Sequence, residues 1–182
     1  MNIIELSNKA YQSAKRRGLY DKEQPLEHYL MLVIDEISEC HKASLEGIES
    51  EVGDFNDYIG NISTSVTGRA YDIIWLDVFD DYIKDSIPDE LADICIMCFS
   101  ALGWKMETMT KFEAKIIERN FVSTPGVYFE SISELLTTLS CRAALADIEC
   151  AVAYTMQYCK ANNNNLEWHV EQKMRYNELR ER

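Results

Sequence analysis

Four carboxylates with matching spacing are the residues of this chain that are best suited to chemistry. Glu36 and Glu39 form one pair, and Glu90 and Asp93 form the other. Each pair is spaced i, i+3 in a segment with a helical pattern, so both members lie on one face of their helix. Two such pairs facing each other would form an oxygen-rich site for a hard cation, Mg²⁺ or alternatively Mn²⁺.

The apolar surroundings of these acidic pairs make them unusual. Segments 30–39 and 89–99 otherwise consist largely of residues that belong in a core. A carboxylate is costly to bury unless it is paired, hydrogen-bonded or bound to a metal. One pair alone would be interpreted as solvated acids or salt-bridge partners, but two pairs with the same spacing on apolar helices favour a metal site.

A row of polar and cationic side chains near the C-terminus complements the acids. Lys173, Asn177 and Arg180 are spaced i, i+4 and i+7, which places them along one helix face. An ammonium, an amide and a guanidinium in a row could hold successive phosphates, and arginine can bind a phosphate through two nitrogens. The alternative interpretation is a solvated basic edge on an otherwise acidic protein.

Helices are expected to position all of these residues. Glycine and proline are scarce, and no alternating apolar pattern persists along the chain. The sequence therefore predicts an all-α bundle of about six helices in a single domain, 1–182. We expect the helices of this bundle at about 2–17, 25–45, 86–102, 104–120, 130–161 and 166–181.

Segment 47–84 separates the two acidic helices. We expect an irregular stretch at 47–69, which is rich in glycine, serine and threonine, and an amphipathic helix at 71–83. The apolar face of that helix fits either an interface with another copy or packing within the chain. Trp75, Trp104 and Trp168 could stack on a nucleotide base, although tryptophan more often belongs to a core.

The order of the acidic and cationic motifs resembles that of a known family. Glu36-x-x-Glu39, Glu90-x-x-Asp93 and Lys173-x-x-x-Asn177-x-x-Arg180 together are similar to the signature of the all-α nucleoside triphosphate pyrophosphohydrolases, the MazG-like group. The connection between the acidic helices is longer than in most of that group. The resemblance therefore implies a MazG-like core with an insertion at about 47–84.

The same resemblance implies an activity and a role for each motif. The activity is Mg²⁺-dependent hydrolysis of a nucleoside triphosphate to the monophosphate and pyrophosphate, which could remove non-standard or surplus nucleotides. The four acids would hold the metal, and either Glu36 or Glu39 would also act on the attacking water. Lys173, Asn177 and Arg180 would bind the phosphates, and the protein would be a homodimer or a homotetramer.

The acidic composition limits the partners of the chain. A formal charge of −13 disfavours nucleic acid polymers and anionic membrane surfaces. No apolar run approaches the ~20 residues of a membrane span, and the N-terminal residues follow an amphipathic pattern rather than that of a signal peptide. The six cysteines, including Cys95 and Cys98, are expected to be reduced thiols, so we expect a cytoplasmic protein.

A non-catalytic alternative uses the same residues. A helical protein that binds a nucleotide or a metal for regulation would also carry the acidic pairs, and the long segment 47–84 is the feature that supports this alternative. Neither the base, the sugar nor the number of metal ions follows from the motifs.

Overall fold

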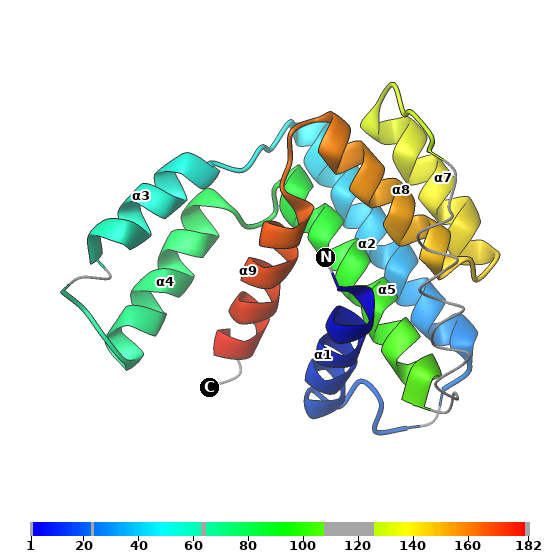
Figure 1. The fold of residues 1–182 in the computed structure, drawn as a ribbon, viewed down its shortest axis with the longest axis horizontal. Helices are drawn as coiled ribbons and strands as arrows, with labels where there is room; N and C mark the ends of the chain where they lie inside the picture. Colours follow the sequence, from blue (N-terminus) through cyan, green and yellow to red (C-terminus); the bar gives the residue numbers. More distant parts are fainter. Residues whose placement is uncertain (1, 23, 63–64, 108–125, 181–182) are drawn as a thin grey trace.

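Every regular element of the described chain is a helix. The computed structural model describes residues 2–22, 24–62, 65–107 and 126–180, and within them the all-α class predicted from the sequence is confirmed (Figure 1). None of the described helices is both long and apolar enough to cross a membrane. The eight described helices are α1 (Ile3–Arg16), α2 (Leu26–Glu46), α3 (Val52–Ile62), α4 (Arg69–Tyr82), α5 (Ile87–Glu107), α7 (Ile132–Ala144), α8 (Ile148–Ala161) and α9 (Leu166–Arg180).

Several helix boundaries differ from the sequence prediction. The single helix expected over 130–161 is wrong, because the chain turns between α7 and α8 at Ala146, whose φ is +56°. Part of the stretch expected to be irregular forms α3. The expected stop at residue 102 is also wrong, because α5 continues to Glu107. The rest of the helix expected at 104–120 lies outside the described residues.

α5 is the central helix of the main core. α1, α2, α8 and α9 all pack against it, and α7 covers α2 and α8 (Figure 1). Apolar side chains surround its axis, and the following ones are at most 1% exposed: Leu91, Ile94, Cys95, Phe99 and Leu102. The two acidic segments therefore belong to helices, α2 and α5, that pack directly against each other.

Two local features fix the ends and the close packing of these helices. Ser86 Oγ accepts a hydrogen bond from the Asp89 N–H at 3.4 Å, which caps the start of α5. A β-carbon at Gly103 would lie 2.3 Å from the Ser7 carbonyl oxygen, so only glycine lets α1 approach α5 this closely. Asn165 Oδ1 caps α9 by accepting a hydrogen bond from the Trp168 N–H at 3.2 Å.

Helices α3 and α4 form a hairpin beside the main core, with α9 lying between α4 and the main core (Figure 1). Its two ends are joined by backbone hydrogen bonds, from the Glu51 N–H to the Tyr82 carbonyl and from the Ile87 N–H to the Ile48 carbonyl, both 2.9 Å. The hairpin and α9 enclose a second cluster of buried residues, called the aromatic cluster: Phe55, Trp75, Val78, Phe79, Ile83 and Tyr176.

The aromatic cluster answers two questions that the sequence left open. The apolar face of 71–83 packs within the chain, where Trp75 and Phe79 stack with ring centroids 5.3 Å apart. Trp104 packs against the main core, and Trp168 packs against the aromatic cluster. All three tryptophans are therefore packing residues. Cys95 and Cys98 are buried free thiols, as predicted.

Candidate functional site

One cavity brings together all seven residues that the sequence analysis selected. It has a volume of about 240 Å³ and lies where α2, α5 and α9 meet, and we call it the carboxylate cavity. The selected residues among its lining are Glu36, Glu39, Glu90, Asp93, Lys173, Asn177 and Arg180. Residues far apart in the sequence thus share one site because α9 packs across the N-terminal half of α5.

The acids are close enough to share a cation. Carboxylate oxygens of Glu36, Glu39 and Glu90 all lie within 4.8 Å of one another, and so do those of Asp89, Glu90 and Asp93. Glu90 is only 3% exposed, and its Oε2 has no hydrogen-bond partner among the described residues. A buried oxygen without a partner and an all-oxygen donor set both fit a hard divalent cation.

Asp89 is a member of this site that sequence reasoning missed. It is completely buried, and its Oδ2 accepts a hydrogen bond from the Asp85 N–H at 3.1 Å. Its Oδ1 has no hydrogen-bond partner among the described residues. Asp89 stands in the first turn of α5 directly before Glu90, where the sequence suggests only a role in the helix start. The sequence does not show that Asp89 is buried beside the other carboxylates, and this is why it was not selected.

Lys173 is paired with carboxylates in this cavity. Its Nζ lies 2.6 Å from Asp89 Oδ2 and 2.7 Å from Asp93 Oδ2, and its side chain is 8% exposed. Burial acts against the charged ammonium, but the two carboxylates outweigh this effect and raise the pKa of Lys173 above its usual value. Lys173 is therefore a charged link between α9 and α5. The phosphate-binding role expected from the sequence stays a prediction.

The exposed end of the cavity carries the other polar groups. Exposure increases along α9 from buried Lys173 through half-buried Asn177 to exposed Arg180. The Arg180 guanidinium lies 5.2 Å from the centre of the Tyr176 ring. Three residues in loops that sequence reasoning did not select complete this end: Arg17 after α1, and Lys84 and Asp85 between α4 and α5. They carry no motif of their own, so only the packing reveals them.

Three acids of the cavity, Glu36, Glu90 and Asp93, have raised pKa values. Burial, with Asp93 and Glu39 adding repulsion, raises the pKa of Glu36 to about 7. Burial and the charge of Asp93 raise the pKa of Glu90 to about 8. Burial also raises the pKa of Asp93, against the opposing charge of Lys173. A divalent cation would reverse these shifts by stabilising the ionised carboxylates.

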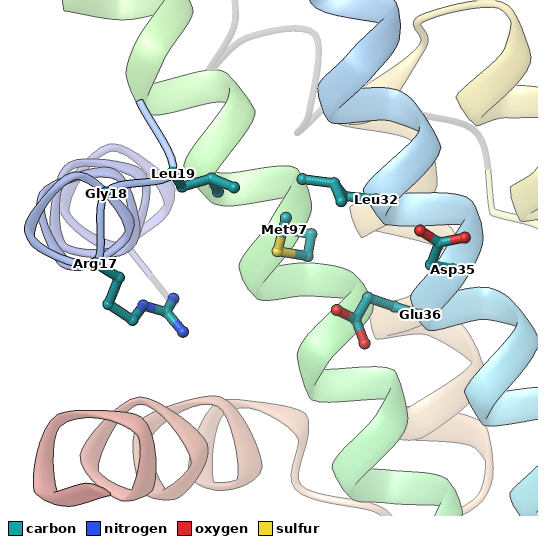
Figure 2. Close-up of a pocket in the computed structure, with 7 residues that line it drawn as sticks. All are labelled: Arg17, Gly18, Leu19, Leu32, Asp35, Glu36 and Met97. Carbon is teal, nitrogen blue, oxygen red and sulfur yellow. The ribbon is translucent and has the colours of Figure 1, made fainter. Parts of the chain in front are cut away.

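A second, larger cavity of about 520 Å³ adjoins the first, and we call it the side cavity (Figure 2). Leu19 and Leu32 point toward each other across it, and Met97 lies between them (Figure 2). Arg17, Glu36 and Met97 line both cavities. Its full lining is Arg17, Gly18, Leu19, Leu32, Asp35, Glu36 and Met97.

The side cavity therefore offers an apolar surface with charged groups at its edge. It opens directly beside the carboxylates, and its volume lies within the range of small-molecule sites. The adjoining cavities could hold two chemically different parts of one ligand, an anionic part next to the acids and an apolar, flat part between the leucines.

Comparisons with known proteins add no relative to this description. No family model, no curated protein and no solved structure matches the chain.

Proposed function

We propose that this protein hydrolyses a nucleoside triphosphate to the monophosphate and pyrophosphate in a Mg²⁺-dependent reaction. The observation that carries the proposal is the convergence of both acidic pairs and of the α9 residues on one cavity. The resemblance of these motifs to the MazG-like group supports the same activity. In this proposal, segment 47–84 is an insertion into a MazG-like core.

The acids would hold the metal. Glu36, Glu39 and Glu90 offer three oxygens within 4.8 Å of one another, and Asp93 extends the group on α5. When bound there, Mg²⁺ or Mn²⁺ would neutralise phosphate charge and lower the pKa of water next to the α-phosphorus. The negative charge of the chain makes such a cation necessary for an anionic substrate.

Protein carboxylates would handle the proton of the reaction. The oxygen of water attacks the α-phosphorus, the bond from that phosphorus to the bridging oxygen breaks, and pyrophosphate leaves with that oxygen. A carboxylate must take the proton that the water loses. Glu36 and Glu39 are both candidates for this role, and both line the cavity.

The cationic end of the cavity would bind the phosphates. Arg17, Asn177 and Arg180 line it from two sides and can donate hydrogen bonds to phosphate oxygens. Lys173 acts indirectly in this scheme, by holding Asp93 in place. The nucleoside would enter the side cavity, where Leu19 and Leu32 can cover the faces of a base.

The test is to incubate the protein with a panel of ribo- and deoxynucleoside triphosphates and Mg²⁺ and to measure both pyrophosphate and orthophosphate. We expect pyrophosphate release that EDTA abolishes and that falls by about 10²–10⁴-fold in Glu39→Gln and Glu90→Gln. Glu27→Gln, an exposed position on α2 outside both cavities, is the matched control and should keep full activity. Orthophosphate as the first product would contradict attack at the α-phosphorus.

The non-catalytic alternative predicts a different result from the same experiment. A regulatory protein would bind the nucleotide or the metal and release neither product. The proposal also includes a cytoplasmic homodimer or homotetramer, and light scattering coupled to gel filtration measures that state directly. A monomer with full activity would contradict the oligomer and leave the reaction standing.

A further inference from the structure

The number of cations in the carboxylate cavity follows from the position of Lys173. We infer that, without nucleotide, the cavity binds one divalent cation at Glu36, Glu39 and Glu90, because the Lys173 ammonium takes the place of a second cation between Asp89 and Asp93. The inference rests on the proposed metal-dependent function and assigns its cation stoichiometry.

Two groups of three carboxylates share Glu90. The first consists of Glu36, Glu39 and Glu90, and the second of Asp89, Glu90 and Asp93. Asp89 is completely buried and does not line the cavity, whereas the other four carboxylates do. By composition alone, each group could hold a divalent cation, which would make a two-cation site. The surroundings of the two groups are nevertheless different.

The second group already contains a positive charge. Lys173 Nζ lies 2.6 Å from Asp89 Oδ2 and 2.7 Å from Asp93 Oδ2. A Mg²⁺ ion binds carboxylate oxygens at about 2.0–2.1 Å, so an ion bridging the same two oxygens would overlap the ammonium nitrogen. Asp89 Oδ1 has no partner among the described residues, but an ion there would lie beside the ammonium and be repelled by it.

Displacing Lys173 would also be costly. Its side chain is 8% exposed, so the ammonium has little access to water that could replace its two carboxylate partners. The first group is different in this respect, because among the described carboxylates of the two groups Lys173 pairs with Asp89 and Asp93 and not with Glu36 or Glu39. The shared Glu90 Oε2 is buried and has no hydrogen-bond partner among the described residues. A buried acceptor without a donor is the condition that a bound cation would satisfy. The divalent cation therefore belongs with Glu36, Glu39 and Glu90.

The experiment counts Mn²⁺ ions bound to the protein without nucleotide, using the electron paramagnetic resonance signal of free Mn²⁺. We expect one ion per chain for the natural sequence and two for Lys173→Met, which replaces the ammonium with an uncharged side chain of similar length. Arg180→Met is the matched control, because it removes a cation from the exposed end of the same cavity and should still bind one ion.

Carboxylate variants locate the ion. Glu39→Gln should weaken Mn²⁺ binding by about tenfold or more, whereas Asp89→Asn should keep one ion at nearly unchanged affinity. Circular dichroism shows whether each variant is folded. If Lys173→Met does not fold, the count for the natural sequence and the contrast between these two variants still decide the question.

Four results would overturn the inference: no ion on the natural sequence, two ions on it, one ion on a folded Lys173→Met, or an ion lost in Asp89→Asn but kept in Glu39→Gln. These outcomes are distinct from failure of the proposed function. One bound ion without pyrophosphate release would support the single-cation inference and contradict the hydrolase. Pyrophosphate release by a protein that binds two ions, or none, without nucleotide would support the hydrolase and contradict the single-cation inference.

Discussion

The main core and the aromatic cluster support opposite sides of the carboxylate cavity, and they are built differently. The main core is large and mostly aliphatic, and it holds the acids on two long helices that pack against each other. The aromatic cluster is small, and it holds the outer half of α9 against a two-helix hairpin. We therefore expect metal binding to depend on the main core and binding of the phosphates to depend on the aromatic cluster.

The largest expected effect comes from breaking the aromatic cluster at its centre. Phe79 is fully buried and stacks on Trp75 and Tyr176 with centroids 5.3 and 4.6 Å apart. Phe79→Ala should lower the free energy of unfolding by about 3–5 kcal/mol, measured by urea denaturation. Phe99→Ala, also fully buried but in the main core, is the matched variant.

The two phenylalanine variants should differ in their effect on metal binding. Under conditions in which both variants are folded, Phe79→Ala should bind Mn²⁺ like the natural sequence, and Phe99→Ala should bind it more weakly. Equal loss of Mn²⁺ affinity in both would show that the two regions do not act separately.

The acid side and buried His169 should make stability depend on pH in opposite directions. Burial lowers the pKa of His169 to about 4, so its contribution rises with pH, and the larger shifts of the acids outweigh it. The folded-state pKa values of Glu36 and Glu90 are raised to about 7 and about 8, so the folded state binds more protons than the unfolded state. Their stabilising contribution is complete below about pH 4.5 and is lost as the pH rises through these values. We expect the metal-free protein to lose several kcal/mol of unfolding free energy between pH 5 and 8.5.

The control for this pH dependence is Glu90→Gln, which should show a shallower decrease of stability over the same pH range. Saturating Mn²⁺ should also suppress the decrease, because the ion favours the ionised carboxylates. A metal-free stability that rises between pH 5 and 8.5 would contradict the raised pKa values.

A pair of glycine substitutions compares the packing of the two regions. Gly103→Ala should cost about 1–3 kcal/mol, because the new β-carbon would meet α1 at 2.3 Å. Gly53 lies in α3 with open space around it, so Gly53→Ala should stabilise the protein by about 0.4–1 kcal/mol. Urea denaturation measures both, and a stabilising Gly103→Ala would disprove the close approach of α1 to α5.

The smallest expected loss of stability comes from one polar contact of the aromatic cluster. The Tyr176 hydroxyl donates a hydrogen bond to Asp80 at 2.6 Å. Tyr176→Phe removes that bond and keeps the stacked ring, so we expect a loss of about 0.5–1.5 kcal/mol in the free energy of unfolding. A loss as large as that of Phe79→Ala would mean that the polar contact, rather than ring packing, holds α9 to the hairpin.

The sequence predicted the parts of this molecule that local patterns encode. Apolar periodicity identified α4, and the expected helix starts at 86 and 166 agree with those of α5 and α9 to within one residue. The spacing of the acids also identified residues that meet in one cavity. Each of these features is encoded by residues close together in one helix, or by the same i, i+3 spacing of acids in two helices.

The remaining features depend on contacts between distant segments. The sequence around the turn at Ala146 contains no glycine or proline, so it carries no turn signal. Lys173 and its partner Asp89 are 84 residues apart in the sequence. No spacing rule predicts a contact over such a separation. Arg17 and Lys84 reach the cavity only because their loops end beside it.

The joined ends of the α3–α4 hairpin have a consequence for how this architecture can arise. Because residues 48 and 87 are hydrogen-bonded neighbours, a short peptide could connect α2 to α5 without the hairpin. The hairpin could thus be replaced or removed at a single point in the chain. Its two helices are adjacent in sequence, so their mutual contacts have low contact order and should form early in folding. The hairpin, which supports the phosphate-binding residues of α9, could then change in evolution while the acidic helices α2 and α5 stay the same.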